Sequence, residues 1–348
     1  MEIVSALEVH RKQITFKTLD LVTGEVRRGQ ISPVTRDHVR TWLTRFAGRD
    51  AHFVLEATTG WRFVAEEIES AGYSAHLAEP AETRARQGRK RRAKSDHADC
   101  RALLDLFLAG RLPQSWIPPA HILELRVRVR LRKALLDERR QWQQRIQAQL
   151  FHQGVRRGIQ LTTAGGRASL AGAALSPAGR QLVDTGLRAI SHLDRELAVQ
   201  DGYLGRFARR QPACRLLSDR LYGVGALTAT AIVAELGDSR RFTSSDDAVR
   251  HSGLDITVWQ SDSRRAPGRL ARQGPSLLRW ALFEAAQSAA RPGSPDHAYY
   301  LQAKARLGHD RACLAVARKL LRRAHHLLRE LGDEALAPVD DQALAAAA

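Results

Sequence analysis

The chain has 348 residues, and its 55 Lys and Arg residues outnumber its 37 Asp and Glu residues to leave a formal net charge of +18. A surplus of this size favours a polyanionic partner, because each phosphate that a protein neutralises releases condensed counterions. The hydrophobic share of 44% excludes wholesale disorder, and the aromatic share of 6% argues against base stacking as the main mode of nucleic-acid binding.

The first 120 residues alternate strand-like and helix-like patterns, which predicts an α/β domain. Ser95 is expected to cap a helix that runs to Leu108. The elements expected before it are strands over 3–9, 13–19 and 25–31, a helix over 33–46, a strand over 51–56, a helix over 61–71 and a strand over 74–78. This order is that of a ribonuclease-H-like domain.

A basic stretch at 84–94 leads into the helix that begins near Ser95. We expect this stretch to bind nucleic acid, because Arg and Lys neutralise backbone phosphates. The residues expected to do so are Arg89, Lys90, Arg91, Arg92 and Lys94.

Residues 121–205 are expected to be helical and elongated. An apolar stripe fits an antiparallel helical pair or a coiled-coil arm; its members are Leu131, Leu135, Trp142, Ile146 and Leu150. A Gly-, Ala- and Ser-rich segment at 154–179 is expected to be irregular, and a second helix is expected over 181–200. The region serves either as a plain helical linker or as an oligomerisation element.

Residues 206–335 are expected to be mainly α-helical, and the Ala-rich stretch 336–348 to be a disordered tail. Gly223 and Gly225 precede a helix expected over 227–236. Two glycines between helices resemble a helix-hairpin-helix, in which turn amides and the following helix N-terminus grip phosphate without reading sequence. A hairpin that only packs two helices together is the alternative.

Four acidic side chains form the clearest candidate for chemistry. Glu8 and Glu56 lie on two strands expected to be neighbours at the centre of the sheet, so both can face one cleft. Asp96 and Asp99 are three residues apart and therefore share one face of a helix. Crowded carboxylates repel one another unless cations neutralise them, and Mg²⁺ prefers oxygen ligands. The sequence therefore predicts a magnesium site that could clamp a phosphodiester.

The cysteines and the apolar runs indicate the cellular compartment of the protein. Cys100, Cys214 and Cys313 are isolated, which argues against a disulfide framework or a structural zinc site. The first residues lack the basic flank and apolar core of a signal peptide, and no apolar run approaches the roughly 20 residues that span a bilayer. We therefore expect a cytoplasmic, nucleoid-associated bacterial protein without a membrane partner.

The chain resembles the insertion-sequence transposases of family one-ten. The segments that carry the resemblance are 55–61, 94–99, 221–225, 252–254 and 268–274. The resemblance implies a RuvC-like DEDD domain over 1–120, a helical middle over 121–205 and a C-terminal transposase domain over 206–335. Glu8 departs from the family pattern, which has Asp on the first strand, and the extra methylene shifts the carboxylate by about 1.5 Å.

The resemblance also implies the reaction and its residues. Ser261 is the expected nucleophile, with Ser263 as its rival, and it would form a phosphoserine link to DNA in a composite site with Glu8, Glu56, Asp96 and Asp99. The arginines expected to position phosphates nearby are Arg264, Arg265 and Arg269.

Further partners follow from the same resemblance. They are double-stranded donor and target DNA, a noncoding guide (bridge) RNA that pairs with both, and further copies of the chain in a homodimer or homotetramer. Two other functions remain open at this point: a junction-resolving nuclease that uses the carboxylates alone, and an inactive nucleic-acid-binding relative.

Overall fold

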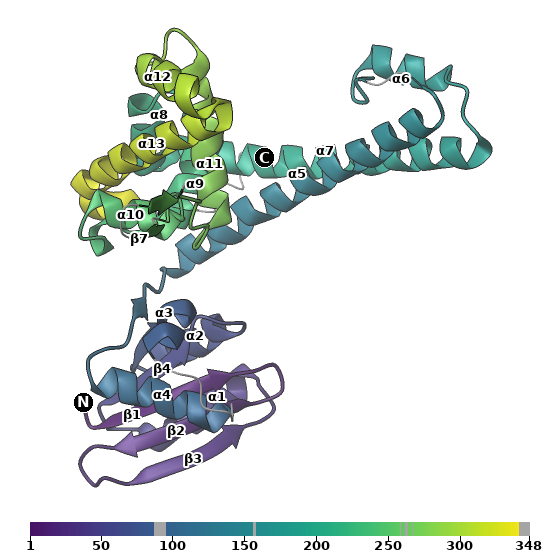
Figure 1. Cartoon of the computed structure of the whole chain (residues 1–348). Helices are drawn as coiled ribbons and strands as arrows, with labels where there is room; N and C mark the ends of the chain where they lie inside the picture. Colours follow the sequence, from purple (N-terminus) through teal and green to yellow (C-terminus); the bar gives the residue numbers. More distant parts are fainter. Residues whose placement is uncertain (87–94, 156–157, 258, 262–263, 267, 341–348) are drawn as a thin grey trace. The chain divides into compact units, whose positions relative to one another are not determined.

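The computed structural model describes residues 1–86, 95–155, 158–257, 259–261, 264–266 and 268–340. The chain divides into two compact units, Met1–Ile117 and Pro118–Ala348, and each unit is described by itself (Figure 1). Among the described residues, no helix combines the length and the apolar character that a bilayer span requires.

The first unit contains a six-stranded mixed sheet. Its strands are β1 (Ile3–Val9), β2 (Ile14–Asp20), β3 (Val26–Ile31), β4 (Ala51–Glu56), β5 (Ser74–Ala78) and β6 (Gln114–Ser115), in the order β3-β2-β1-β4-β5-β6. The first three strands form the predicted antiparallel meander, and β4 and β5 add in parallel beside β1. The two-residue strand β6, which the sequence pattern does not indicate, closes the far edge antiparallel to β5. This arrangement is consistent with the expected ribonuclease-H-like domain.

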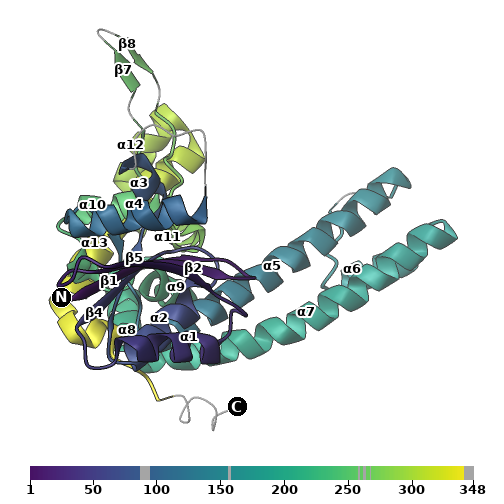
Figure 2. The ribbon, with the colours of Figure 1, turned by 90° about the horizontal axis from the view of Figure 1, so that it is seen from below.

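Helices cover both faces of this sheet (Figure 2). On one face, α1 (Arg36–Leu43) and α2 (Trp61–Ser70) pack against alternate residues of β1 such as Leu7. On the other face, α4 (Asp96–Leu108) packs against Val4 and Ala6. Strand β1 is buried along its whole length because successive side chains enter two different cores.

Two short helices complete the first unit. The 3₁₀ helix Thr44–Phe46 extends α1 to the predicted end of that helix. Helix α3 (Pro80–Arg86) begins where the sequence indicates only the approach to a basic stretch. Ser95 caps α4 as predicted, since its hydroxyl accepts a hydrogen bond from the Ala98 amide.

Two long helices, α5 (Ala120–His152) and α7 (Pro177–Arg210), pack side by side in the second unit (Figure 1). The prediction of an irregular segment at 154–179 is wrong in part, because α6 (Ala164–Ala171) lies within it and α7 already begins at Pro177. The predicted stripe is also wrong in part: Leu131 is 44% exposed, whereas Ile146 and Leu150 are buried. Helix α7 continues through residue 205, and the proposed domain boundary there stays a prediction.

The rest of the second unit is a helical body around α9 (Ala226–Leu236). This helix is buried on nearly every side because its residues are almost all apolar. The other helices of the body are α8 (Pro212–Arg220), α10 (Ser245–Ser252), α11 (Ser276–Gln287), α12 (His297–Leu307) and α13 (His309–Leu331), with 3₁₀ turns at Ser239–Arg241, Ser288–Ala290 and Gly332–Leu336. Between α10 and α11 the chain forms a hairpin with strands β7 (Trp259–Ser261) and β8 (Arg264–Ala266).

Candidate active site

The two central strands bring Glu8 and Glu56 to the same face of the sheet. Strands β1 and β4 run parallel with Leu7 opposite Leu55, so the next residue on each strand, Glu8 and Glu56, points to the opposite face from this pair. That face is the one covered by α4, because Val54, two residues before Glu56, packs in the α4 core.

Helix α4 supplies the other two carboxylates. Asp96 and Asp99 both lie in its first turn, where the partial positive charge of the helix N-terminus stabilises acidic side chains. The apolar side of α4, with Leu103 and Leu104, packs on the face of the sheet that carries Val4. This packing holds α4 against β1.

Two residues that the sequence reasoning missed connect β1 to α4. His10 Nε2 lies 3.3 Å from Asp96 Oδ1 and 3.6 Å from Glu8 Oε1, and Gln13 Nε2 donates to Asp96 Oδ2 at 3.5 Å. His10 and Gln13 flank the turn between β1 and β2, where the His10 amide donates to the Gln13 carbonyl. The signal in the sequence is the short gap between the first two predicted strands, which places both residues next to the end of β1.

Glu8 is the most perturbed of the four acids. It is 9% exposed, and burial raises its pKa to about 7, with further contributions from the negative charges of Glu56, Asp99 and Asp96. Its Oε2 atom is buried and accepts no hydrogen bond within the described part of the chain. A buried carboxylate surrounded by like charges gains from a cation at this position.

The cluster fits a divalent cation by its donors more than by its present geometry. All four acids offer the oxygen ligands that Mg²⁺ prefers, and the orphaned Glu8 oxygen lacks any other partner among the described residues. However, no group of three or more His, Cys, Asp or Glu side chains in the described ranges is arranged closely enough to hold a metal ion as it stands. The four carboxylates thus share an electrostatic environment without forming a finished coordination sphere.

The predicted serine lies on the β7–β8 hairpin of the second unit. Ser261 is the last residue of β7 and pairs with Arg264, and Arg265 pairs with Gln260. The structure describes the backbone of these residues but not their side chains, and Ser263 lies outside the described residues. Arg269 is exposed at the base of the hairpin.

The basic residues predicted to precede α4 also lie outside the described residues. They are Arg89, Lys90, Arg91, Arg92 and Lys94. Their contact with nucleic acid stays a prediction.

The predicted glycine turn joins α8 to α9. Gly223 has a φ of +85°, and a Cβ at this position would lie 2.0 Å from Ser288 Oγ and 2.5 Å from the Ala285 carbonyl oxygen. Packing against the end of α11 therefore explains this glycine without a ligand. Gly225 is the N-cap residue of α9 and has open space around it, and its predicted role in phosphate binding stays a prediction.

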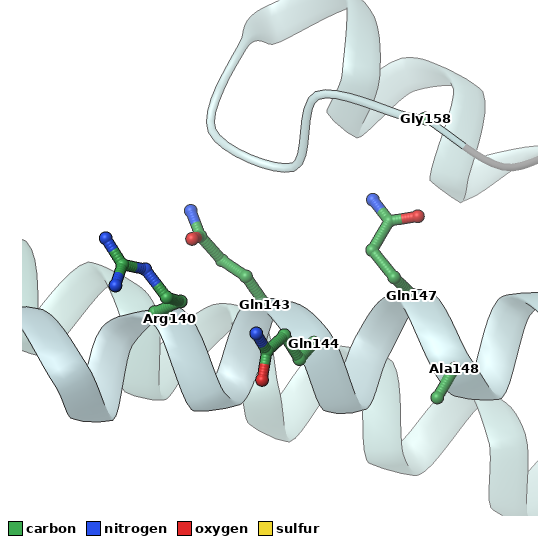
Figure 3. Close-up of a pocket in the computed structure, with 6 residues that line it drawn as sticks. All are labelled: Arg140, Gln143, Gln144, Gln147, Ala148 and Gly158. Carbon is green, nitrogen blue, oxygen red and sulfur yellow. The ribbon is translucent and has the colours of Figure 1, made fainter. Parts of the chain in front are cut away.

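A pocket on α5 is lined by none of these predicted residues. It is lined by Arg140, Gln143, Gln144, Gln147, Ala148 and Gly158 (Figure 3). The Gln147 side chain donates to the Ile159 carbonyl at 2.7 Å and so ties the segment after α5 back to that helix. This pocket contains none of the carboxylates or hairpin residues considered above.

Carboxylates at the ends of two central strands, in a chain with a net charge of +18, are the combination expected of a protein that processes nucleic acid. The comparisons with known families agree. A model of DEDD transposases, described as "Transposase", matches residues 8–152, and a model described as "Transposase IS116/IS110/IS902 family" matches residues 215–301. The chain belongs to the IS110 family of transposases, which confirms the resemblance seen in the sequence. A search of curated proteins gives no significant match.

Proposed function

We propose that the protein is the transposase of a bacterial insertion sequence and exchanges DNA strands through a covalent phosphoserine intermediate. Glu8, Glu56, Asp96 and Asp99 would hold Mg²⁺, and Ser261 would be the nucleophile. The observation that carries the proposal is the buried, like-charged environment of Glu8 in a chain that belongs to a transposase family.

The carboxylates provide the first part of the chemistry. Mg²⁺ bound by them supplies positive charge that offsets the negative charge of the reacting phosphate. The positions of the carboxylates would determine where this charge lies. Glu8 and Glu56 are held by two central strands, and Asp96 is held by contacts with His10 and Gln13. Positions fixed by strands and a capped helix favour reproducible geometry.

Ser261 provides the second part. In the proposed step, a bond forms between its Oγ and phosphorus while the phosphorus–oxygen bond to one DNA strand breaks. The hydroxyl proton passes to a base, and the departing oxygen takes up a proton. The covalent link preserves the energy of the phosphodiester, so a second strand can later displace the serine and be joined.

Sequence specificity would come from a noncoding guide RNA that pairs with donor and target DNA, while the protein contacts shape and backbone. The net charge of +18 supports binding of such polyanions. A composite site that combines the carboxylates of one subunit with the serine of another would require assembly as a homodimer or homotetramer.

A junction-resolving nuclease is the second candidate. It is favoured by one observation: all four acids lie in a single compact unit and need no residue of the other unit to form a cluster. Such an enzyme would leave free cut ends and no protein–DNA link.

The trapping of a covalent adduct tests the proposal. The protein is co-expressed with the noncoding DNA that flanks its gene, incubated with donor and target DNA and Mg²⁺, denatured, and analysed by gel shift and peptide mass spectrometry. We expect an adduct on Ser261 that is lost in Ser261→Ala and kept in the matched control Ser263→Ala. Cut DNA without any adduct would contradict the proposal and support the nuclease.

A further inference from the structure

The hairpin that carries Ser261 leaves the helical body as two paired segments between residues 253 and 274. The Thr257 amide donates to the Arg269 carbonyl at 2.8 Å, and the Ala271 amide donates to the Asp255 carbonyl at 3.1 Å. These bonds form the base of the hairpin, from which β7 and β8 project beyond the helices (Figure 2).

The two segments touch backbone to backbone where they enter the body. A Cβ at Gly253 would lie 2.1 Å from the Gln273 carbonyl oxygen, and a Cβ at Gly274 would lie 1.9 Å from the His251 carbonyl oxygen. Both glycines also have positive φ values, +67° and +91°. The crossing is therefore tight, and it leaves several carbonyl groups of both segments in need of donors.

Two arginines from the body supply these donors. The Arg279 Nη1 atom on α11 donates to the Ser252 carbonyl at 2.8 Å, to the Gly274 carbonyl at 3.0 Å and to the Gln273 carbonyl at 3.3 Å. Arg279 thus holds both segments at once. From α13, Arg318 Nε donates to the carbonyl of Leu254 at 2.6 Å.

Apart from its hydrogen bonds to these carbonyls, the position of Arg279 is electrostatically unfavourable for a positive charge. It lies in the first turn of α11, where the helix dipole disfavours a cation. Burial lowers its pKa, and the nearby positive charge of Arg272 adds to this effect. No carboxylate within the described part of the chain forms an ion pair with Arg279. Its interactions with the three carbonyls of the hairpin base are what compensate for this position.

We propose that Arg279 and Arg318 are positioning residues for the nucleophile: they fix the base of the hairpin and so determine how Ser261 meets the DNA phosphate. This inference rests on the proposed role of Ser261. A small rotation at the base is amplified along the hairpin, and a misplacement of about 1 Å at the reacting atom can slow a reaction by about 100-fold.

Single-turnover adduct formation at increasing DNA concentration tests this role. For Arg279→Ala and Arg318→Ala, we expect the maximal rate to fall by at least about tenfold, while the DNA concentration at half-maximal rate changes by less than about twofold. The matched control is Arg322→Ala, one turn beyond Arg318, because Arg322 pairs with the exposed Asp246 and not with the hairpin. We expect it to behave like the wild type.

The conservative variant Arg279→Lys distinguishes a positioning role from a general contribution to the stability of the fold. Arg279 uses one nitrogen for all three carbonyls, so the ammonium of Arg279→Lys can replace it in part. We expect this variant to recover most of the maximal rate. If Arg279→Ala does not fold, the comparison of Arg279→Lys with Arg318→Ala still decides the question.

Hydrogen exchange of the hairpin base gives a readout that does not depend on activity. The Thr257 and Ala271 amides should exchange faster in Arg279→Ala than in the wild type, and amides of α9 should not change. Unchanged exchange and an unchanged maximal rate in the folded variants would overturn the inference. If the wild type forms no adduct on Ser261, the proposed function fails, whereas the exchange data still show whether Arg279 holds the hairpin.

Discussion

Glu8→Gln should stabilise the protein at alkaline pH, although it removes a residue proposed to be essential. In the folded chain the pKa of Glu8 is raised from 4.5 to about 7. The folded state therefore binds this proton more tightly than the unfolded state does. The favourable contribution is present below pH 4.5 and is lost as pH rises through about 7.

The size of the effect follows from the shift. A difference of about 2.5 pKa units corresponds to about 3 kcal/mol of unfolding free energy at pH 8. This figure is an upper bound, because solvent screens part of the repulsion between the carboxylates. Glutamine keeps the shape and removes the charge, so Glu8→Gln should gain up to this amount at pH 8 and much less at pH 5.

Urea unfolding at pH 5 and pH 8 is monitored by pulsed hydrogen exchange of peptides from β1 and β4. It measures the free energy of unfolding of the first unit alone. Mg²⁺ at pH 8 should stabilise the wild type more than Glu8→Gln, because binding to the folded state is linked to folding. A Glu8→Gln variant that is no more stable than the wild type at pH 8 would refute the reasoning.

Glu67→Gln is the matched control for this experiment. Glu67 is also buried, but hydrogen bonds from Arg40 and Arg36 lower its pKa. Its stabilising contribution is present above its unfolded pKa and is lost as pH falls. The substitution should therefore destabilise the first unit at pH 8, the opposite sign to Glu8→Gln.

Three further outcomes are expected. Asp99→Asn should slow DNA cleavage by on the order of 100-fold or more without weakening DNA binding, as seen in cleavage and filter-binding assays. Wild-type cleavage should require Mg²⁺ and stop in chelator; cleavage by Glu8→Asp alone, with none by the wild type, would instead identify an inactive relative. Gly223→Ala should cost about 2 kcal/mol or more in thermal unfolding, because of its positive φ and the backbone oxygen of Ala285, whereas Gly225→Ala should cost much less.

Local patterns predicted the sheet of the first unit well. The strands Ile3–Val9, Ala51–Glu56 and Ser74–Ala78 have the predicted bounds, because apolar, strand-favouring runs end there at turns. The cap at Ser95 was equally readable, since it depends on residues three apart. The short strand Gln114–Ser115 was not, because its pairing with β5 is a tertiary contact that two residues cannot signal.

The second unit shows where the sequence pattern misleads. Glycine and alanine around residue 165 favour a loop by composition, yet the Thr163 hydroxyl caps α6 and Leu170 is buried against the α5–α7 pair. Leu131 fits the helical stripe by spacing but remains exposed. A helix as long as α5 meets different partners along its length, so one stripe cannot describe its buried face.

The residue types of the candidate site could be predicted from the sequence, but the energetic cost of burying Glu8 could not. Spacing placed Asp96 and Asp99 on one helix face, and the expected strand order placed Glu8 beside Glu56. The contacts of His10 with Asp96 and Glu8 depend instead on the turn between β1 and β2. The orphaned oxygen of Glu8 depends on how closely α4 covers the sheet.

The energetic cost at Glu8 is itself an argument about function. A fold selected only for stability would replace a buried carboxylate that has one oxygen without a hydrogen bond and whose ionisation costs up to about 3 kcal/mol at neutral pH and above, since total stabilities are only about 5 to 15 kcal/mol. An electrostatic cost of this kind is typical of functional sites, where a bound ligand offsets it. In the proposed function, a cation that relieves the repulsion between Glu8 and Glu56 would also contact the DNA phosphate. Stability with and without Mg²⁺ is therefore a test of the active site that needs neither guide RNA nor DNA target.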